Sequence, residues 1–487
     1  MAKKKEKPIT RDKGLTSRPP VVAVLGHVDH GKTTLLDKIR QTNVVASEAG
    51  GITQNIGAYQ VESKKKKITF IDTPGHAAFS QMRSRGAKVA DLVVLVIAAD
   101  EGVKPQTLES LKHIKSAKVI YLVALAKIDL PNINIERVKK EISSQGIALE
   151  KYGGDVVCVP VSGKTGKGIE DLLEMILVLA EMAELKGSLD APLEAVVIES
   201  KLDSRKGTLA TILVRNGSLK VGEELIVDNK VSKIRAMFNE WGKPVALAGP
   251  STPVEILGFK EAPTVGAPVI HSQGETPVSL EEKGKKRTIG KTEAEKLKII
   301  LKADTAGTLE AITSSLPEEV QVIYSDVGNV KESEVLLADT TRAEIVAFNV
   351  KAPGSVKKLA EIEKIKITHH KIIYKLLEEI EKKVLKILEP TIDEEVLGKA
   401  EVLEEFEIDN ERIAGCRVVE GEIKKTDRFH LLRKGEILGD CRIKSMKTSK
   451  KDIERAKKGE EFGAILSPVL DFDIGDMLVS FRKVEES

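Results

Sequence analysis

The residues best suited to chemistry lie near the N-terminus, in a glycine-rich segment between an apolar run and a helical pattern. The segment comprises Gly26, His27, Val28, Asp29, His30, Gly31, Lys32, Thr33 and Thr34. Its spacing matches GxxxxGKS/T, in which backbone N–H groups and the start of the following helix surround phosphate oxygens. Lys32 is expected to reach the β- and γ-phosphates, and the Thr33 hydroxyl to ligate Mg²⁺. The segment therefore predicts a nucleoside-phosphate site.

A second segment, Asp72–His76, follows the apolar run Ile68–Ile71 and reads DTPGH. The Asp72 carboxylate at the end of that strand is expected to hold Mg²⁺ through water, and the Gly75 N–H to contact a γ-phosphate. His76 then stands where it could position an attacking water. Thr53, in the loop 48–57, is expected to give the metal a second hydroxyl, and triphosphate would order this loop. The predicted metal ligands are Thr33, Thr53 and Asp72.

Two further segments follow later strands of the same region and are suited to recognising a base. They comprise Ala126, Lys127 and Asp129, and Ser162, Gly163 and Lys164. The Asp129 carboxylate can accept hydrogen bonds from N1 and N2 of guanine, a donor pair that adenine lacks. The Lys127 stem can lie over the base, and a backbone N–H near Gly163 can donate to guanine O6. With the phosphate segments, they predict a guanine-nucleotide switch that binds GTP or GDP with Mg²⁺.

The elements that must position these residues are short β-branched runs alternating with helical patterns, which favour a parallel sheet covered on both faces. Later segments read as a small antiparallel barrel, a second α/β region, an amphipathic helix that Pro390 ends, and a second barrel. We expect a basic flexible tail (1–20), a P-loop GTP-binding domain (21–187), a β-barrel (190–272), a charged linker (273–293), a small α/β/α domain (294–370), a long connecting helix (371–390) and a C-terminal β-barrel (391–487).

The composition argues against a membrane protein and a disulfide-rich protein, but it does not indicate a binding partner. The chain has 487 residues with 77 basic and 74 acidic side chains, a net charge of +3 that implies no particular ligand. The longest apolar runs, Leu92–Ala99 and Val119–Ala126, are eight residues each, whereas a membrane span needs about 20. The three cysteines have no CxxC spacing, which argues against a disulfide scaffold. A cytoplasmic monomer with no membrane partner is expected.

The motifs resemble those of the translational GTPases, with Gly26–Thr33 as the GHVDHGKT loop and Asp72–His76 as the DTPGH switch. More narrowly, the chain is similar to the family of bacterial translation initiation factor two. The segments that carry this resemblance span roughly residues 19 to 482, and they include EAGGITQNIGAY (48–59), LKADTAGTLEAI (301–312) and IAGCRVVEGEIK (413–424). The resemblance implies a GTP-bound factor that brings formylmethionyl initiator tRNA to the small ribosomal subunit and promotes joining of the large subunit. Contact with the ribosome would trigger hydrolysis, and other initiation factors would be partners.

The resemblance also assigns residues and exposes departures. His76 would orient the attacking water once the factor is docked. The initiator-tRNA pocket would be lined by Cys416, Lys447, Glu461, Phe462 and Gly463. The family's base-recognition motif normally begins with asparagine where this chain has Ala126, which predicts weaker nucleotide binding. Phe462 replaces a cysteine, and Thr448-Ser449 replace Arg-Tyr, so the pocket is expected to be reshaped.

Two alternatives remain open at this point. A GTP-binding ribosome-assembly protein with little turnover would share the phosphate motifs, and in it Ala126 would mark a degraded site. An elongation or specialised tRNA-delivery factor would share the nucleotide motifs but would lack the region 301–350 and the helix before Pro390. Hydrolysis measured with and without ribosomes distinguishes the first alternative from an active switch.

Overall fold

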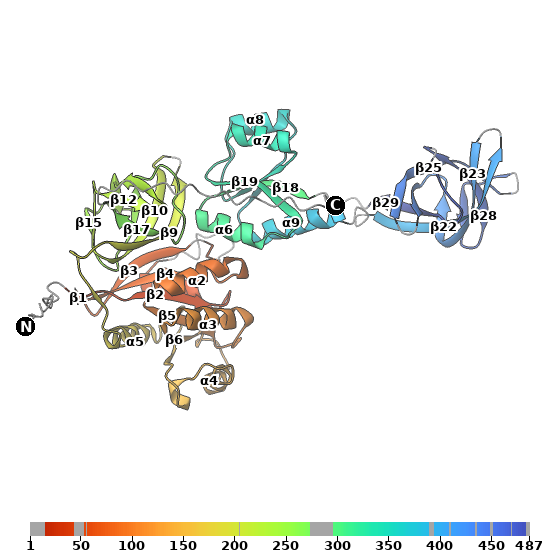
Figure 1. The fold of residues 1–487 in the computed structure, drawn as a ribbon. Helices are drawn as coiled ribbons and strands as arrows, with labels where there is room; N and C mark the ends of the chain where they lie inside the picture. The colour runs from red at the N-terminus through yellow and green to blue at the C-terminus, as the bar shows by residue number, and fades with distance from the viewer. Residues whose placement is uncertain are drawn as a thin grey trace, which may run out of the picture. The chain divides into compact units, whose positions relative to one another are not determined.

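The computed structural model describes residues 15–42, 53–54, 56–203, 205–272, 296–388, 394–408, 411–433, 436–448, 451–468 and 470–483. The chain divides into two compact units, Met1–Glu381 and Lys382–Ser487 (Figure 1). The predicted linker 273–293 and the predicted helix stop at Pro390 lie outside the described residues. None of the described helices has the length and apolar character needed to cross a membrane.

The first part of unit 1 is built on a six-stranded sheet with the order β3-β4-β2-β5-β6-β7. Its strands are β2 (Val21–Gly26), β3 (Gly57–Ser63), β4 (Lys66–Asp72), β5 (Leu92–Ala98), β6 (Ile120–Ala126) and β7 (Cys158–Pro160). The strands from β4 to β7 in this order pair in parallel, as the sequence predicts. Edge strand β3 is the exception, because it forms an antiparallel hairpin with β4. The sheet is therefore mixed at one edge.

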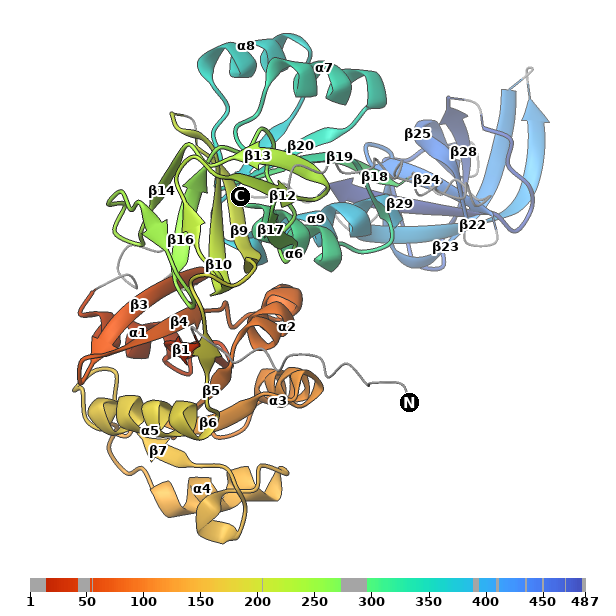
Figure 2. The ribbon, with the colours of Figure 1, turned by 60° about the vertical axis from the view of Figure 1, so that its left-hand side comes forward.

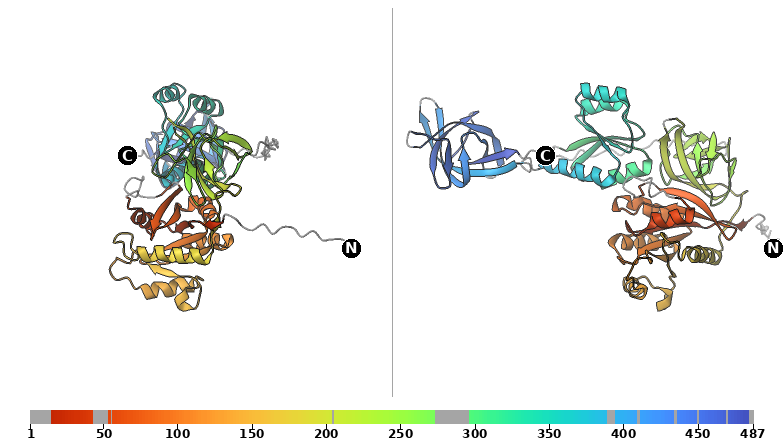
Figure 3. Two further views of the ribbon diagram at one scale, coloured as in Figure 1. Left: turned by 90° about the vertical axis from the view of Figure 1, so that its left-hand side faces the viewer. Right: turned by 180° about the vertical axis from the view of Figure 1, so that it is seen from behind.

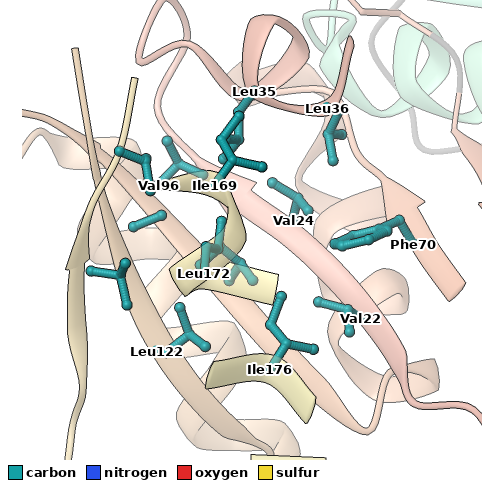
Figure 4. Close-up of a cluster of buried hydrophobic side chains, with 14 of the residues drawn as sticks. Val22, Val24, Leu35, Leu36, Phe70, Val96, Leu122, Ile169, Leu172 and Ile176 are labelled. Atoms are coloured by element: carbon teal, nitrogen blue, oxygen red, sulfur yellow. The ribbon is translucent and has the colours of Figure 1, made fainter. Parts of the chain in front are cut away.

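Helices cover both faces of this sheet, since its central strands are apolar on both sides. Helices α1 (Lys32–Arg40) and α5 (Ile169–Met182) pack on one face. Figure 4 shows Leu172 and Ile176 of α5 beside side chains of β2 and β6. Figure 2 shows α2 (Ser80–Val89) and α3 (Pro105–Ala117) on the other face. The short elements are α4 (Ile135–Ser144), η2 (Ala77–Phe79) and η3 (Glu150–Tyr152).

The N-terminal boundary predicted at residue 21 is wrong, because the chain joins the fold at residue 16. Strand β1 (Thr16–Ser17) pairs with β8 (Lys186–Gly187). The Arg18 guanidinium then donates two hydrogen bonds of 2.6 Å to the Asp91 carboxylate and one of 3.0 Å to Ser251. Both ionic side chains are nearly buried, at 10% and 5% exposure. The basic composition of residues 1–20 gives no sign of these contacts, because the partner residues lie far along the chain.

An antiparallel sheet of seven strands follows, with the order β13-β12-β17-β9-β10-β16-β14 (Figure 2). Its side chains share a single apolar core, as expected for the predicted barrel. The strands of this region are β9 (Glu194–Asp203), β10 (Gly207–Asn216), β11 (Leu219–Lys220), β12 (Glu224–Val227), β13 (Lys230–Lys233), β14 (Ala236–Phe238), β15 (Leu247–Ala248), β16 (Pro253–Leu257) and β17 (Pro268–His271).

The α/β/α architecture predicted for the third region is confirmed (Figure 3). Its four parallel strands have the order β19-β18-β20-β21. Helices α7 and α8 share a core with one face of this sheet, and α6 and the start of α9 lie on the opposite side in Figures 1 and 3. The elements are β18 (Leu297–Ala303), α6 (Ala306–Ser315), β19 (Val320–Val327), α7 (Glu332–Thr341), β20 (Glu344–Phe348), α8 (Gly354–Ile362), β21 (Ile367–His370) and α9 (Ile373–Leu388).

Unit 2 is a closed barrel, as predicted. Strand β22 pairs with both β29 and β23, so β22-β29-β24-β25-β28-β23 form a closed ring around one core. Closure removes the unpaired strand edges. The strands are β22 (Glu394–Ile408), β23 (Glu411–Lys424), β24 (Arg428–Arg433), β25 (Glu436–Thr448), β26 (Lys451–Asp452), β27 (Arg455–Lys457), β28 (Glu461–Ser467) and β29 (Met477–Lys483).

The Arg18–Asp91 pair gives a test of the corrected boundary. Arg18→Ala should lower the free energy of unfolding by about 3 kcal/mol, the low end for breaking a buried ion pair, because Arg215 still faces Asp91 at 3.4 Å. Urea unfolding followed by the fluorescence of Trp241, the single tryptophan, measures this. Lys66→Ala, which breaks an exposed pair with Glu181, should cost less than about 1 kcal/mol. Equal costs for the two variants would show that the Arg18–Asp91 pair stabilises the fold no more than an exposed ion pair does.

Candidate functional site

The predicted phosphate segment lies where β2 ends and α1 begins, at the carboxyl edge of the sheet. A pocket of about 170 Å³ opens there. It is lined by Val28, Asp29, Gly31, Lys32, Thr33, Thr34, Thr53, Gly75, His76 and Tyr374. The structure thus brings residues of both predicted phosphate segments and Thr53 to one place. Tyr374, from α9, was not predicted.

The loop that forms the floor of this pocket is held by its own backbone geometry. Asp29 and Gly31 both adopt positive φ angles, 60° and 85°. The Val28 N–H donates to Gln106 Oε1 at 3.1 Å, which fixes the loop against α3. His30 is fully buried beneath it, and burial lowers its pKa to about 4. The His30 ring is therefore neutral and supports the loop from below. His27 takes part through its backbone, because its carbonyl oxygen accepts a hydrogen bond from Lys32.

Lys32 carries the positive charge of the pocket. Its side chain is 6% exposed, and the Nζ donates to the His27 carbonyl oxygen. Burial lowers the Lys32 pKa to about 8, although Asp72 opposes this shift. A Cβ at position 75 would lie 2.4 Å from that Nζ and 3.1 Å from the Val28 nitrogen, so a larger residue there would push the ammonium group aside.

Oxygen ligands suited to Mg²⁺ converge beside Lys32. The hydroxyl oxygens of Thr33 and Thr53 lie 2.8 Å apart, although the two residues are 20 positions apart in the chain. Asp72 ends β4, next to β2 in the sheet, and its charge acts on Lys32. Two hydroxyls and a carboxylate match the oxygen preference of Mg²⁺, so these residues fit that ion. Most of the loop 48–57 lies outside the described residues.

His76 lies at the rim of the pocket in a defined tautomer. Its Nδ1 accepts a hydrogen bond from the Ala78 N–H at 2.9 Å, so in the neutral ring the proton is on Nε2. Burial, with a smaller contribution from Arg83, lowers the His76 pKa. The neutral ring therefore dominates at pH 7, with one N–H free of that backbone bond.

A buried arginine supports the backbone around His76. Arg83 on α2 is fully buried, and its guanidinium donates to the carbonyl oxygens of Pro74 and His76. It also donates to Glu109 on α3 at 2.7 Å. Glu109 accepts a further hydrogen bond from Ser80. This network fixes the start of α2, and sequence reasoning missed it because α2 itself was not predicted.

The predicted base-recognition residues meet on the adjoining side of the same edge. Asp129 accepts a 2.7 Å hydrogen bond from the Ser162 hydroxyl, and this bond, with help from the exposed Lys164, lowers the Asp129 pKa. Lys127 forms ion pairs of 3.1 Å and 3.3 Å with Asp100 and Glu101. Gly163 packs against α1 so closely that a Cβ would lie 2.9 Å from Leu35 N.

Ala126 ends β6 and is 3% exposed. Its side chain belongs to the core shared with Leu35 and Leu36 of α1. Position 126 thus faces α1, the helix that follows the phosphate loop, and its methyl group offers no hydrogen bond.

Comparisons with known proteins agree with this geometry. Residues 18–182 match the Elongation factor Tu GTP binding domain, residues 192–272 match Elongation factor G domain 2, and residues 271–381 match Translation-initiation factor 2. Translation initiation factor IF-2 of Caldanaerobacter subterraneus is 43% identical over 98% of this chain and 71% of the relative. This chain belongs to the IF-2 family. It is a translation initiation factor and a GTPase that binds GTP and GDP.

Other similar proteins carry related names. IF-2 of Bacillus subtilis is 42% identical to the present chain, over 96% of the present chain and 69% of the relative. A solved structure, GDP-bound aIF5B from Aeropyrum pernix, is 30% identical over 96% of this chain and 92% of its own, with a TM-score of 0.48. The family assignment argues against an assembly protein without initiation function.

The predicted tRNA-binding residues of this IF-2 family member lie on three neighbouring strands of unit 2. In the register of the barrel, Cys416 is opposite Phe462, and Gly463 is opposite Lys447. Cys416 and Phe462 are 1% and 3% exposed and belong to the barrel core. Both side chains therefore face the barrel core, because alternate residues of a strand face opposite sides, and their part in tRNA binding stays a prediction.

The remaining predicted residues are accessible. Lys447 and Glu461 are exposed, and Glu461 pairs with Arg417 at 3.0 Å. Thr448 donates to the Glu461 carbonyl oxygen at 2.9 Å, whereas Ser449 lies outside the described residues. Phe462 fills the core, so its effect on a pocket would be indirect.

Ala126→Asn tests whether the missing carboxamide limits nucleotide affinity. One or two regained hydrogen bonds, each worth about 0.5–1.5 kcal/mol, should tighten GTP and GDP binding by similar factors of about 5- to 100-fold. Isothermal titration gives both constants. Ala126→Val, which adds bulk without a polar group, should not tighten either nucleotide. An asparagine variant that binds no more tightly than the parent would show that another group already fills this role.

Proposed function

We propose that this IF-2 family member hydrolyses GTP in the pocket at the end of β2, with Lys32, Thr33, Thr53, Asp72 and His76 as the working side chains. The observation that carries this proposal is that Lys32, Thr33, Thr53 and His76, from three separate segments, line one pocket of about 170 Å³. Asp72 ends the neighbouring strand β4, and its charge acts on Lys32. The buried ammonium of Lys32 would meet the β- and γ-phosphates. Their negative charge would offset the cost of burying Lys32, since opposite charges favour the protonated form.

Thr33, Thr53 and Asp72 would hold Mg²⁺, which when bound neutralises charge on the β- and γ-phosphate oxygens. The backbone N–H of Gly75 would donate to the γ-phosphate. Since Thr53 and Gly75 belong to different loops, both loops would close on a triphosphate and relax with a diphosphate. The Thr33–Thr53 hydroxyl contact of 2.8 Å supports this closure.

His76 would orient the attacking water. Its Nδ1 accepts the Ala78 N–H, which leaves the Nε2–H to donate toward the water or a phosphate oxygen. The Arg83 guanidinium holds the His76 carbonyl, so the backbone that carries the ring is fixed. The roles proposed here are positioning and polarisation, both suited to phosphoryl transfer, in which the protein needs to supply little covalent chemistry.

Guanine would be recognised by Asp129, which the Ser162 hydroxyl orients. Lys127 would lie over the base, with its ammonium held by Asp100 and Glu101. Gly163 would offer its backbone N–H to guanine O6. The low Asp129 pKa keeps the carboxylate ionised, as two hydrogen bonds from guanine require.

We further propose that unit 2 binds formylmethionyl initiator tRNA and that the factor acts with both ribosomal subunits and other initiation factors. The support is the resemblance of residues 413–424 to the family, together with the exposed side chains of Lys447 and Glu461 on neighbouring strands. Filter binding of formylated against unformylated initiator tRNA tests this assignment.

His76→Ala tests the proposed role in hydrolysis. GTP affinity should stay nearly unchanged, because the phosphate contacts come from other residues. Ribosome-stimulated hydrolysis should fall by about 10²- to 10⁴-fold, the usual scale for one positioned catalytic group. The release of radiolabelled phosphate measures the rate. His271→Ala, which changes a histidine of the barrel that pairs with Glu223, serves as a control and should retain most activity. Parental turnover in the His76 variant would remove this ring from the mechanism.

Removal of residues 391–487 separates the two proposed activities. The truncated protein should bind GTP like the parent, because all phosphate and base elements lie before residue 170 in a unit with its own core. It should not bind initiator tRNA. Nucleotide titration and tRNA filter binding on the same preparation measure both, with circular dichroism as the folding control. Retained tRNA binding would place that site in unit 1.

A further inference from the structure

We propose that Tyr374, at the start of α9, is a positioning residue of the GTPase centre that aligns the His76 ring for reaction. This inference rests on the proposed role of His76. It adds a residue almost 300 positions away in the sequence and on a helix that none of the nucleotide motifs includes.

The contact between the two rings is direct. The ring centroids of His76 and Tyr374 lie 4.1 Å apart at an interplanar angle of 74°, an edge-to-face arrangement. Phe79 contacts the same imidazole, at 6.2 Å and 78°. With Nδ1 held by the Ala78 N–H, the imidazole is restrained at one edge and packed by aromatic rings. The direction of its Nε2–H is thus set by Tyr374 together with Phe79.

Tyr374 also lines the pocket itself, alongside Asp29, Thr53 and His76. It is partly buried, and burial together with the nearby Asp29 carboxylate raises the pKa of its hydroxyl. The hydroxyl stays protonated in the physiological range. Tyr374 therefore presents a neutral ring to the pocket, which can exclude water from one side of His76.

The loop that carries Thr53 holds the same turn of α9. Gln54 Nε2 donates to the Lys371 carbonyl oxygen at 2.9 Å, and Gln54 Oε1 accepts the Ile373 N–H at 3.2 Å. One carboxamide therefore grips the backbone on both sides of residue 372. A carboxylate could accept the N–H but could not donate to the carbonyl oxygen. Gln54, which follows the proposed metal ligand Thr53, thus fixes the turn that places Tyr374 against His76.

This arrangement predicts how two substitutions at one position differ. Tyr374→Phe keeps the ring and should keep the ribosome-stimulated hydrolysis rate within about 3-fold. Tyr374→Ala frees the imidazole and should lower the kcat by about 10- to 100-fold, the cost expected for a misplaced catalytic group. GTP affinity by isothermal titration should stay within about 3-fold in both. Lys375→Ala, on an exposed position of the same turn, should match the parent.

A double-mutant cycle distinguishes positioning from general support of the fold. If Tyr374 acts through His76, Tyr374→Ala should cause no further loss in a His76→Ala background. Gln54→Ala, which detaches the same turn, should lower the rate in the parent and have little effect in Tyr374→Ala.

The other outcomes have distinct meanings. An unchanged or faster rate in Tyr374→Ala would overturn the proposal, and so would a full additional loss in the His76→Ala background. Equal losses in the alanine and phenylalanine variants would also overturn it, since ring packing could not then be the cause. A normal rate in His76→Ala alone would instead reject the proposed role of His76, so the two failures can be told apart.

Discussion

The buried ammonium of Lys32 is the constraint on which the nucleotide site depends. It is largely removed from water, so burial lowers its pKa to about 8, and a bound phosphate would raise that pKa again. The DTPGH segment approaches it closely, since a Cβ at position 75 would lie 2.4 Å from the Lys32 Nζ and would displace the ammonium group. That approach places His76, the next residue, at the rim of the pocket. The geometry of hydrolysis thus follows from how one cation is covered.

Much of the site could be predicted because its chemistry is local. The phosphate loop and the ends of β4, β6 and β7 are short segments, and parallel strands necessarily bring their carboxyl ends to one edge. The meeting of Thr33 and Thr53 could be expected because a single connection, from α1 to β3, joins the two residues. The fold class was equally accessible, since apolar runs and glycine turns determine which regions are α/β and which are barrels. Only the antiparallel hairpin of β3 departs from the expected sheet.

What could not be predicted depends on contacts distant in sequence or on weak local patterns. Tyr374 sits in an apolar helical stretch with nothing to distinguish it from a core residue, and its partner is almost 300 positions away. Helix α2 has few apolar residues, so neither it nor its buried Arg83 was expected. The burial of Phe462 was different, because the alternation of Glu461, Phe462 and Gly463 along a strand already placed the middle side chain inward.

The contacts of the GTP-binding sheet with the rest of unit 1 fall into two groups. The barrel is joined through Ser251, whose carbonyl oxygen accepts from Gln60 and Thr69 on β3 and β4, and through Arg215, which pairs with Asp91 at 3.4 Å. The third region is joined through Gln54, which follows the pocket residue Thr53 and holds the start of α9, and through Arg85 on α2, which pairs with Glu310 on α6 at 2.9 Å. Under the proposed function, a change of nucleotide that moved the loop of Thr53 and Gln54 would therefore act directly on the start of α9. The position of the α/β/α region would then depend on a loop that is proposed to contact the nucleotide.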